Sequence, residues 1–272
     1  MKNDLKLLVI GCGKMGGALL DGALNGGAVG KENVRIVEKN ADICEIFAQK
    51  GIKTADNFNA FADFSPDIVF LAVKPFIVAD VLPDVKPFTD KGASVLSIVA
   101  GKKTAFYEKA LGDKTPVIRA MPNTPALIGK GMSAAFANAF VSPEIMEKVQ
   151  NLFETCGVFC RLDNEDAIDA VTAVSGSGPA YLFYFVEALK EAALKSGIPE
   201  GLCETFARQT VCGAAELLEK TRESPAVLRR NVTTPNGTTA AALSVFENNA
   251  VLFSLVEKAV LAAKDRSREL AG

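Results

Sequence analysis

Histidine and tryptophan are absent from this 272-residue sequence, and the missing histidine narrows the possible chemistry. Without an imidazole the protein has no Ser-His-Asp triad and no histidine acid-base of the usual dehydrogenase kind. The six cysteines form no CxxC pair, and the closest spacing, Cys156 with Cys160, has no histidine to complete a metal site. We therefore expect free thiols in a reducing compartment and no bound metal.

Long apolar runs and strong net charge are also missing. No uninterrupted apolar run reaches about 18 residues, and the short one before Gly11 is too brief for a signal peptide or a spanning helix. A net charge of −2 gives no general attraction to nucleic acid or to anionic membranes. These absences predict a soluble, cytoplasmic protein that binds neither nucleic acid nor membrane.

The first part of the chain alternates short apolar runs with amphipathic stretches. The expected strands are Leu5–Ile10, Val34–Val37, Ile68–Val73, Val95–Val99, Val117–Ala120, Ser133–Phe140 and Gly157–Leu162. The expected helices are Gly16–Leu24, Ala41–Lys50, Pro75–Val81 and Pro143–Cys156. Short apolar strands that alternate with helices predict a parallel sheet covered on both faces.

From Asp166 onward the sequence becomes rich in alanine and helical in pattern. The expected helices are Pro179–Ser196, Pro199–Lys220, Pro225–Arg230 and Thr239–Leu270, the last broken near Asn248 and Asn249. The predicted fold class is α/β, with a Rossmann-type dinucleotide-binding domain over residues 1–164 and an all-helical dimerisation domain over residues 165–272. Apolar helices of this kind bury a face against a second copy, which predicts a dimer.

A glycine-rich loop follows the first strand and opens a helix. In Gly11-x-Gly13-x-x-Gly16 the first glycine permits a tight turn, the second lets a pyrophosphate approach, and the third lets the helix pack on the strand. The helix N-terminus then offers free N–H groups to the phosphates. The predicted cofactor-binding loop consists of Gly11, Cys12, Gly13, Lys14, Met15 and Gly16.

The second strand ends in two adjacent residues of opposite charge, Glu38 and Lys39. A carboxylate here would bind the adenosine ribose hydroxyls and favour NADH, whereas a cation would accept the 2′-phosphate of NADPH. Both residues are predicted to contact the cofactor, and the sequence leaves open which of the two dinucleotides is preferred.

Later strands also end in residues suited to a cofactor, because ligands of open α/β sheets bind at the carboxyl edge. Lys74 can reach a phosphate or ribose, small residues follow the next strand, and Asn123 carries a carboxamide beside two prolines. The cofactor-binding residues predicted from these strand ends are Ala72, Val73, Lys74, Pro75, Ile98, Val99, Ala100 and Asn123.

Two loops in the helical part combine small residues and hydroxyls at the start of a helix. Such positions offer backbone N–H groups to a carboxylate. Two of them in one helical domain predict a pocket for a small anionic substrate. The residues that the loops contribute are Ser175, Gly176, Ser177 and Gly178 in one, and Gly237, Thr238 and Thr239 in the other.

Over nearly its whole length the chain resembles the pyrroline-5-carboxylate reductases, which catalyse the last step of proline biosynthesis. The most specific block resembles the signature of that family, in which Gly-x-Thr is followed by a small and an aliphatic residue. The matching blocks are Ala72-Val73-Lys74-Pro75, Met121-Pro122-Asn123-Thr124-Pro125, Ser175-Gly176-Ser177-Gly178-Pro179-Ala180-Tyr181 and Val232-Thr233-Thr234-Pro235-Asn236-Gly237-Thr238-Thr239-Ala240-Ala241-Ala242-Leu243.

The resemblance implies roles for individual residues. Thr239 would be the catalytic residue that hydrogen-bonds the substrate ring nitrogen, and the backbone around Gly237 and Thr238 would hold the substrate carboxylate. Glu165 matches an acidic position near the substrate.

For the cofactor, Asn57 or Asn59 matches a contacting asparagine, and Asn231 matches one that reaches the cofactor from the partner subunit. Members of the family are interlaced dimers that often assemble into decamers.

The reaction implied is reduction of 1-pyrroline-5-carboxylate to L-proline by NADPH or NADH. This chemistry suits a chain without histidine, because a protonated cyclic imine accepts a hydride and needs alignment more than acid catalysis. Two alternatives stay open at this point. A 3-hydroxyacid dehydrogenase would need a catalytic lysine, for which Lys190 and Lys195 are the candidates. A non-catalytic dinucleotide sensor would give no function to the two loops of the helical part.

Overall fold

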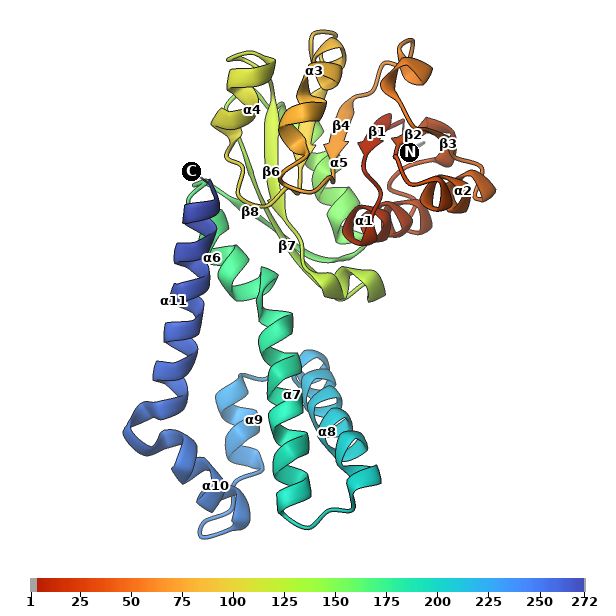
Figure 1. Ribbon diagram of the computed structural model, residues 1–272. Helices are drawn as coiled ribbons and strands as arrows, with labels where there is room; N and C mark the ends of the chain where they lie inside the picture. Colours follow the sequence, from red (N-terminus) through yellow and green to blue (C-terminus); the bar gives the residue numbers. More distant parts are fainter. Residues whose placement is uncertain (1–3, 272) are drawn as a thin grey trace. The chain divides into compact units, whose positions relative to one another are not determined.

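The computed structural model describes residues 4–271, which form two compact units. One unit comprises the residues up to Ser177 together with those from Ala263 onward, and the other spans Gly178–Ala262. Figure 1 labels the helices and strands of both. The division between the two compact units therefore falls after residue 164, and the last helical turns of the chain belong to the first unit. The boundary between residues 164 and 165 stays a prediction.

The first unit is built on an eight-stranded sheet in the order β3-β2-β1-β4-β5-β6-β7-β8. Neighbouring strands are parallel, except that β6 and β7 run antiparallel. The strands are β1 (Leu7–Ile10), β2 (Val34–Val37), β3 (Lys53–Ala55), β4 (Ile68–Leu71), β5 (Ser94–Ser97), β6 (Val117–Met121), β7 (Gly131–Ala137) and β8 (Gly157–Leu162).

Helices cover both faces of this sheet, as the sequence predicts. Successive residues of β1 alternate between two cores: Leu7 and Val9 pack with α1 and α5, while Leu8 and Ile10 pack with α3 and α4. The elements are α1 (Lys14–Asn25), η1 (Lys31–Asn33), α2 (Ala41–Gln49), η2 (Phe58–Phe61), α3 (Val78–Thr89), α4 (Thr104–Leu111), η3 (Thr124–Ile128), α5 (Pro143–Glu154), α6 (Ala167–Val171) and the π-helical turn η4 (Thr172–Gly176).

The expected helix Pro75–Val81 is wrong in its bounds, because α3 runs from Val78 to Thr89 with Pro83 and Pro87 inside it. Each proline removes one intrahelical hydrogen bond. The stripe of buried residues Val78, Leu82, Val85 and Phe88 nevertheless packs against the sheet. Burial of this apolar face therefore outweighs the unfavourable prolines.

Strand β3 and helix α4 were not expected from the sequence. Both are short, and β3 is exposed or half-buried, so neither carries a strong apolar period. The antiparallel direction of β7 is a second difference from the expected parallel sheet. Residues 122–130 are too few for the crossover of about a dozen residues that a parallel connection needs.

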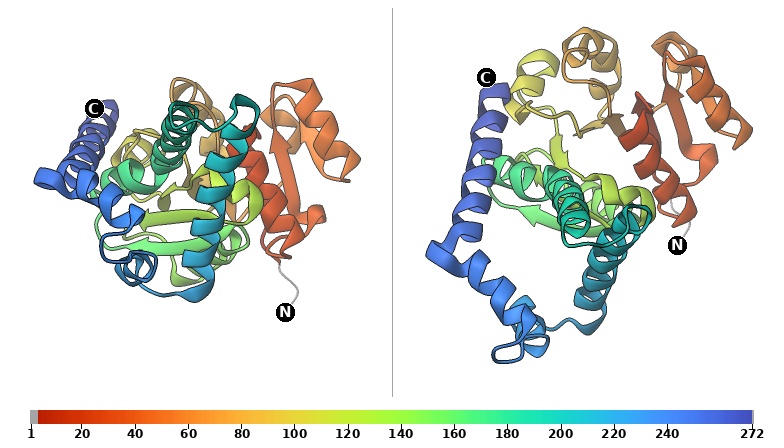
Figure 2. Two further views of the ribbon diagram at one scale, coloured as in Figure 1. Left: turned by 90° about the horizontal axis from the view of Figure 1, so that it is seen from below. Right: turned by 60° about the horizontal axis from the view of Figure 1, so that its bottom comes forward.

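The second unit is helical. Its helices are coloured from teal to blue in Figure 1 and Figure 2, and α7 packs against α8. The expected break near Asn248 and Asn249 is confirmed, because Asn249 has a φ of 51° within a kink. The elements are α7 (Gly178–Lys195), α8 (Glu200–Thr221), α9 (Pro225–Asn231), α10 (Thr238–Glu247), η5 (Asn248–Ala250) and α11 (Val251–Ala271), whose last turns join the first unit.

The helices of the second unit expose many large apolar side chains, among them Phe183, Tyr184, Val245 and Phe253. By length and composition alone, Thr238–Leu270 is apolar enough to cross a membrane, and none of its most apolar stretch is buried. A soluble protein covers an apolar surface of this extent with another surface.

Candidate functional site

The glycine-rich loop has the geometry that its spacing predicts. Gly11 has a φ of +79°, which the tight turn after β1 uses, and its N–H donates to the Val37 carbonyl at 2.9 Å and so extends the pairing of β1 with β2. A Cβ on Gly13 would meet no atom within 4 Å, so this side of the loop is open. A Cβ on Gly16 would lie 2.7 Å from the Ala72 Cβ, so only glycine lets α1 pack this close to the end of β4.

Helix α1 begins at Lys14 directly after Gly13, and no side chain caps its first turn. The N–H groups of this turn therefore have no intrahelical acceptors, and an anion can bind there. Cys12 and Met15, in contrast, pack on the apolar core. Of the predicted loop, the backbone and the lysine face outward while these two side chains support it.

A cavity of about 430 Å³ lies beside this loop at the carboxyl edge of the sheet. Its walls include the apolar side chains Ile43, Phe58 and Phe76, which the sequence reading did not single out. Flat aromatic and aliphatic walls suit an adenine ring. The predicted residues that line the cavity are Gly11, Gly13, Glu38, Lys39, Ala72, Val73 and Lys74.

Glu38 is held in this cavity by the main chain. Its Oε2 accepts a hydrogen bond from the Cys12 N–H at 2.7 Å, and its Oε1 accepts one from the Asn40 N–H at 2.9 Å. Burial and the nearby Glu38 charge together raise the pKa of the Cys12 thiol to about 12. Cys12 is therefore a neutral packing residue in this loop.

Four other predicted cofactor residues do not line this cavity. The Asn57 side chain caps η2 by accepting from the Ala60 N–H at 3.2 Å, and Val99 is buried with its N–H donating to Ser97 Oγ. Ile98 packs on the core, and Ala100 follows Val99 in the loop after β5. These positions shape the loops around the cavity, and direct contact with a cofactor stays a prediction for each.

Both polar groups of the Asn123 carboxamide form hydrogen bonds within the protein. Its Nδ2 donates to the Ser175 carbonyl at 3.0 Å, and its Oδ1 accepts from the Met132 N–H at 2.9 Å. The side chain is nearly buried. Asn123 therefore ties the end of β6 to the turn that contains Ser175.

The expectation of free donors along Ser175–Gly178 is wrong for two groups. Residues 172–176 form a π-helical turn, in which the Ser177 N–H donates to the Thr172 carbonyl at 2.8 Å. The Ser175 hydroxyl donates to the Val171 carbonyl at 3.1 Å. The helical backbone begins before Ser175, so the Ser177 N–H and the Ser175 hydroxyl have backbone carbonyl partners. Such π turns are frequent at functional sites, and a substrate role for Ser175, Gly176, Ser177 and Gly178 stays a prediction.

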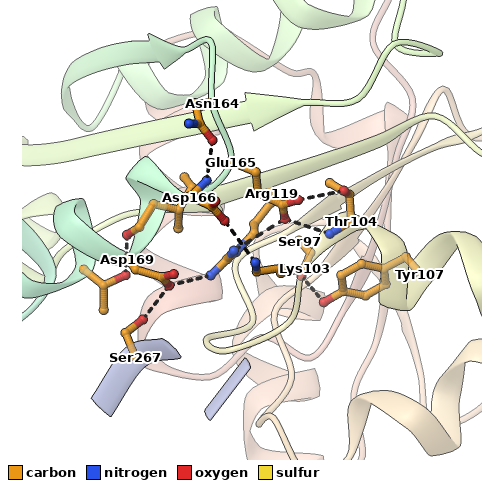
Figure 3. Close-up of polar contacts among 12 residues, drawn as sticks. Ser97, Lys103, Thr104, Tyr107, Arg119, Asn164, Glu165, Asp166, Asp169 and Ser267 are labelled. Carbon is orange, nitrogen blue, oxygen red and sulfur yellow. Dashed lines mark hydrogen bonds and ion pairs between the residues drawn. The ribbon is translucent and has the colours of Figure 1, made fainter. Parts of the chain in front are cut away.

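A buried charge network surrounds Arg119, the central residue of β6 (Figure 3). Arg119 is 1% exposed, and its guanidinium pairs with Asp169 at 3.3 Å and with Glu165 at 3.4 Å. Asp169 also accepts from the Ser267 hydroxyl on α11 at 2.8 Å. The sequence pattern does not mark Arg119 or Asp169, because a single polar residue inside an apolar run has no periodic signature. It does not mark Ser267 either, because that residue lies in a charged stretch and its partner is 98 positions away.

Glu165 belongs to this network. Its two carboxylate oxygens accept from the Thr104 N–H at 2.8 Å and from the Thr104 hydroxyl at 2.9 Å, which caps the start of α4 (Figure 3). Nearby, the Tyr107 hydroxyl shares a 2.6 Å hydrogen bond with Ser97, and burial raises the pKa of Tyr107 to about 12. The network therefore connects the loop after β5 to α6 and to the last turns of α11.

The loop before α10 also has the predicted form. Asn236 has a φ of 59°, Gly237 precedes the first helical residue, and no side chain caps that end. A Cβ on Gly237 would clash with Thr234 Oγ1, so a larger residue there would force the threonine side chain to shift. The first-turn N–H groups, those of Thr238 and Thr239 among them, have no intrahelical acceptors and suit a carboxylate.

Asn231, the remaining predicted residue, ends α9, where its Nδ2 lies 3.5 Å from Glu223 Oε2. Within residues 4–271, no group of three or more histidine, cysteine or acidic side chains is placed to hold a metal ion.

Two family models match the chain. Residues 6–101 match the family described as NADP oxidoreductase, coenzyme F420-dependent, and residues 165–270 match the family described as pyrroline-5-carboxylate reductase dimerisation. A pyrroline-5-carboxylate reductase of Pseudomonas aeruginosa is 40% identical over 98% of this chain and 97% of its own.

Solved structures agree with these matches. A pyrroline-5-carboxylate reductase of Coxiella burnetii superimposes with a TM-score of 0.92 at 34% identity, over 99% of this chain and 100% of that one. A Plasmodium falciparum pyrroline carboxylate reductase with NADP bound gives 0.83 at 30% identity over the full length of both chains.

Proposed function

The chain belongs to the pyrroline-5-carboxylate reductase family, and from this premise we propose that it reduces 1-pyrroline-5-carboxylate to L-proline with NADPH or NADH, the last step of proline biosynthesis. The observation that carries the proposal is the match of 40% identity across almost the whole of both chains. The strand, glycine loop and uncapped helix around the 430 Å³ cavity independently fit a dinucleotide.

The reaction needs little general-acid catalysis. When bound, the reduced nicotinamide supplies a hydride, which adds to C5 of the ring. In a protonated imine this carbon is already electrophilic, so the charge on nitrogen is neutralised as the C–H bond forms. The protein then contributes proximity and orientation, which explains how a chain without histidine performs the reaction.

On the cofactor side, the uncapped first turn of α1 would hold the pyrophosphate, and the cavity walls would hold the adenosine. We propose that the cofactor contacts the glycine loop, Glu38, Lys39, Asn57, the residues at the strand ends and Asn231.

On the substrate side, the first-turn N–H groups of α10 at Thr238 and Thr239 would hold the carboxylate, and the Thr239 hydroxyl would orient the ring nitrogen. The turn at Ser175–Gly178 would supply part of the pocket wall. Glu165 would act near the substrate through its contacts with Thr104 and Arg119.

We also propose that the protein is a cytoplasmic homodimer that assembles further into decamers. The match to the dimerisation family over residues 165–270 supports self-association. The exposed apolar side chains of the second unit supply a surface that a second copy would cover.

Substituting Thr239 with alanine tests the catalytic assignment. Loss of one hydrogen bond to the reacting ring is expected to lower kcat/KM for pyrroline-5-carboxylate by about ten- to a hundredfold. Thr239→Ser keeps the hydroxyl and should retain most of the activity. Ser244→Ala is the matched control on the same helix, because that hydroxyl only bonds the Ala241 carbonyl. Unchanged kinetics in Thr239→Ala would remove the proposed role.

The reaction itself is tested by following NADH and NADPH consumption with pyrroline-5-carboxylate, beside a panel of 3-hydroxyacids with NAD and NADP. Proline formation is the expected result. Turnover of hydroxyacids alone would identify a different dehydrogenase, and no turnover would indicate a dinucleotide sensor.

A further inference from the structure

The Glu38 carboxylate is fixed in place before any cofactor binds. One oxygen accepts from the Cys12 N–H and the other from the Asn40 N–H, at 2.7 and 2.9 Å. The main chain at Glu38 is held as well, because its N–H donates to the Ala55 carbonyl at 2.9 Å. Two hydrogen bonds hold the carboxylate and a third holds the main chain of the same residue, which leaves this side chain little freedom to swing out of the cavity.

This anchoring determines which ligand group fits beside the carboxylate. Each carboxylate oxygen has two lone pairs, and one on each remains available after the backbone bonds are made. An acceptor pair at the end of β2, beside the glycine loop, suits two hydroxyl donors on the adenosine ribose. A 2′-phosphate has no such donor when it is doubly ionised, and it would bring like charge against a group that cannot move away.

Building on the proposed function, we propose that Glu38 is the specificity-determining residue of this enzyme and that it makes NADH the preferred cofactor over NADPH. The neighbouring cation does not reverse this preference. Lys39 lines the same cavity, but its side chain is exposed and makes no hydrogen bond or ion pair within residues 4–271. A mobile lysine can approach or leave a phosphate, whereas the carboxylate stays in place.

Two half-cofactors that lack the nicotinamide ring test the inference without any turnover. ADP-ribose and its 2′-phosphate are titrated into the unmodified protein by isothermal calorimetry. The expected result is that ADP-ribose binds about tenfold more tightly or better. Equal binding, or tighter binding of the phosphorylated compound, would overturn the inference, and so would binding of neither.

Substitutions at two neighbouring residues then identify which of them sets the cofactor preference. Glu38→Gln keeps the shape but removes the charge, and it should bring the two affinities within about threefold of each other. Lys39→Gln is the matched control and should leave the ratio unchanged. If only Lys39→Gln alters the ratio, the lysine is the determinant and the inference is wrong.

Steady-state kinetics separate this inference from the proposed function. The ratio of kcat/KM for NADH and NADPH should follow the calorimetric ratio. Proline formation with NADPH favoured would keep the function and refute the role of Glu38. The expected half-cofactor ratio without any imine reduction would keep the role of Glu38 and refute the function.

Discussion

Replacing Arg119 with methionine should strongly destabilise the first unit. Methionine fills similar space, but the change leaves Asp169, which is 1% exposed, and Glu165 without their shared cation. Removing one partner of a buried ion pair costs about 3–5 kcal/mol. Because the Ser267 and Thr104 hydrogen bonds remain, we expect about 3–4 kcal/mol here, near the lower end of that range.

The assay is urea unfolding at pH 7 followed by circular dichroism, with the melting temperature as a second measure. For a unit of this size the expected loss corresponds to a fall in Tm of roughly 6–16 °C.

Lys103→Met is the matched control, because Lys103 pairs with the exposed Asp166 in the same cluster (Figure 3). A solvent-exposed pair contributes little, so this variant should melt close to the unmodified protein. The reasoning is refuted if Arg119→Met and Lys103→Met unfold at the same urea concentration.

Two further predictions concern the glycine loop. Gly16→Ala places a Cβ 2.7 Å from the Ala72 Cβ and should lower stability by about 1–3 kcal/mol, whereas Gly13→Ala should keep the Tm and weaken NADH binding, seen by nicotinamide fluorescence. An unaltered Tm in Gly16→Ala would contradict the packing argument. With a pKa of about 12, Cys12 carries roughly 10⁻⁴ thiolate at pH 8. Iodoacetamide should therefore modify the exposed Cys160 while sparing Cys12, and peptide mapping that finds equal labelling would refute this.

Local patterns in the sequence determined a large part of the fold. The apolar strands, the glycine loop after β1, and the glycine before α10 are all recognisable because their signals lie within a few consecutive residues. Gly11 has the positive φ that glycine adopts readily, and Gly237 stands where a Cβ would press on Thr234, so both constraints act inside one turn. The expected helical second half is confirmed for the same reason.

Tertiary structure alone decided the features that join distant residues. Helix α3 continues through two prolines because its buried stripe packs on the sheet, and β7 runs antiparallel because its connection is short. The π turn at Thr172–Gly176 uses hydroxyl and N–H groups that were expected to be free.

Two polar pairings between distant residues were likewise not evident from the sequence. Glu38 meets Cys12 across 26 positions, and Ser267 meets Asp169 across 98. No local period records such pairs, because only the folded sheet and the returning helix bring them within hydrogen-bond distance. The sequence therefore determined which residue types stand at the glycine loop and after β2, and the tertiary structure decided which of their side chains are held in place.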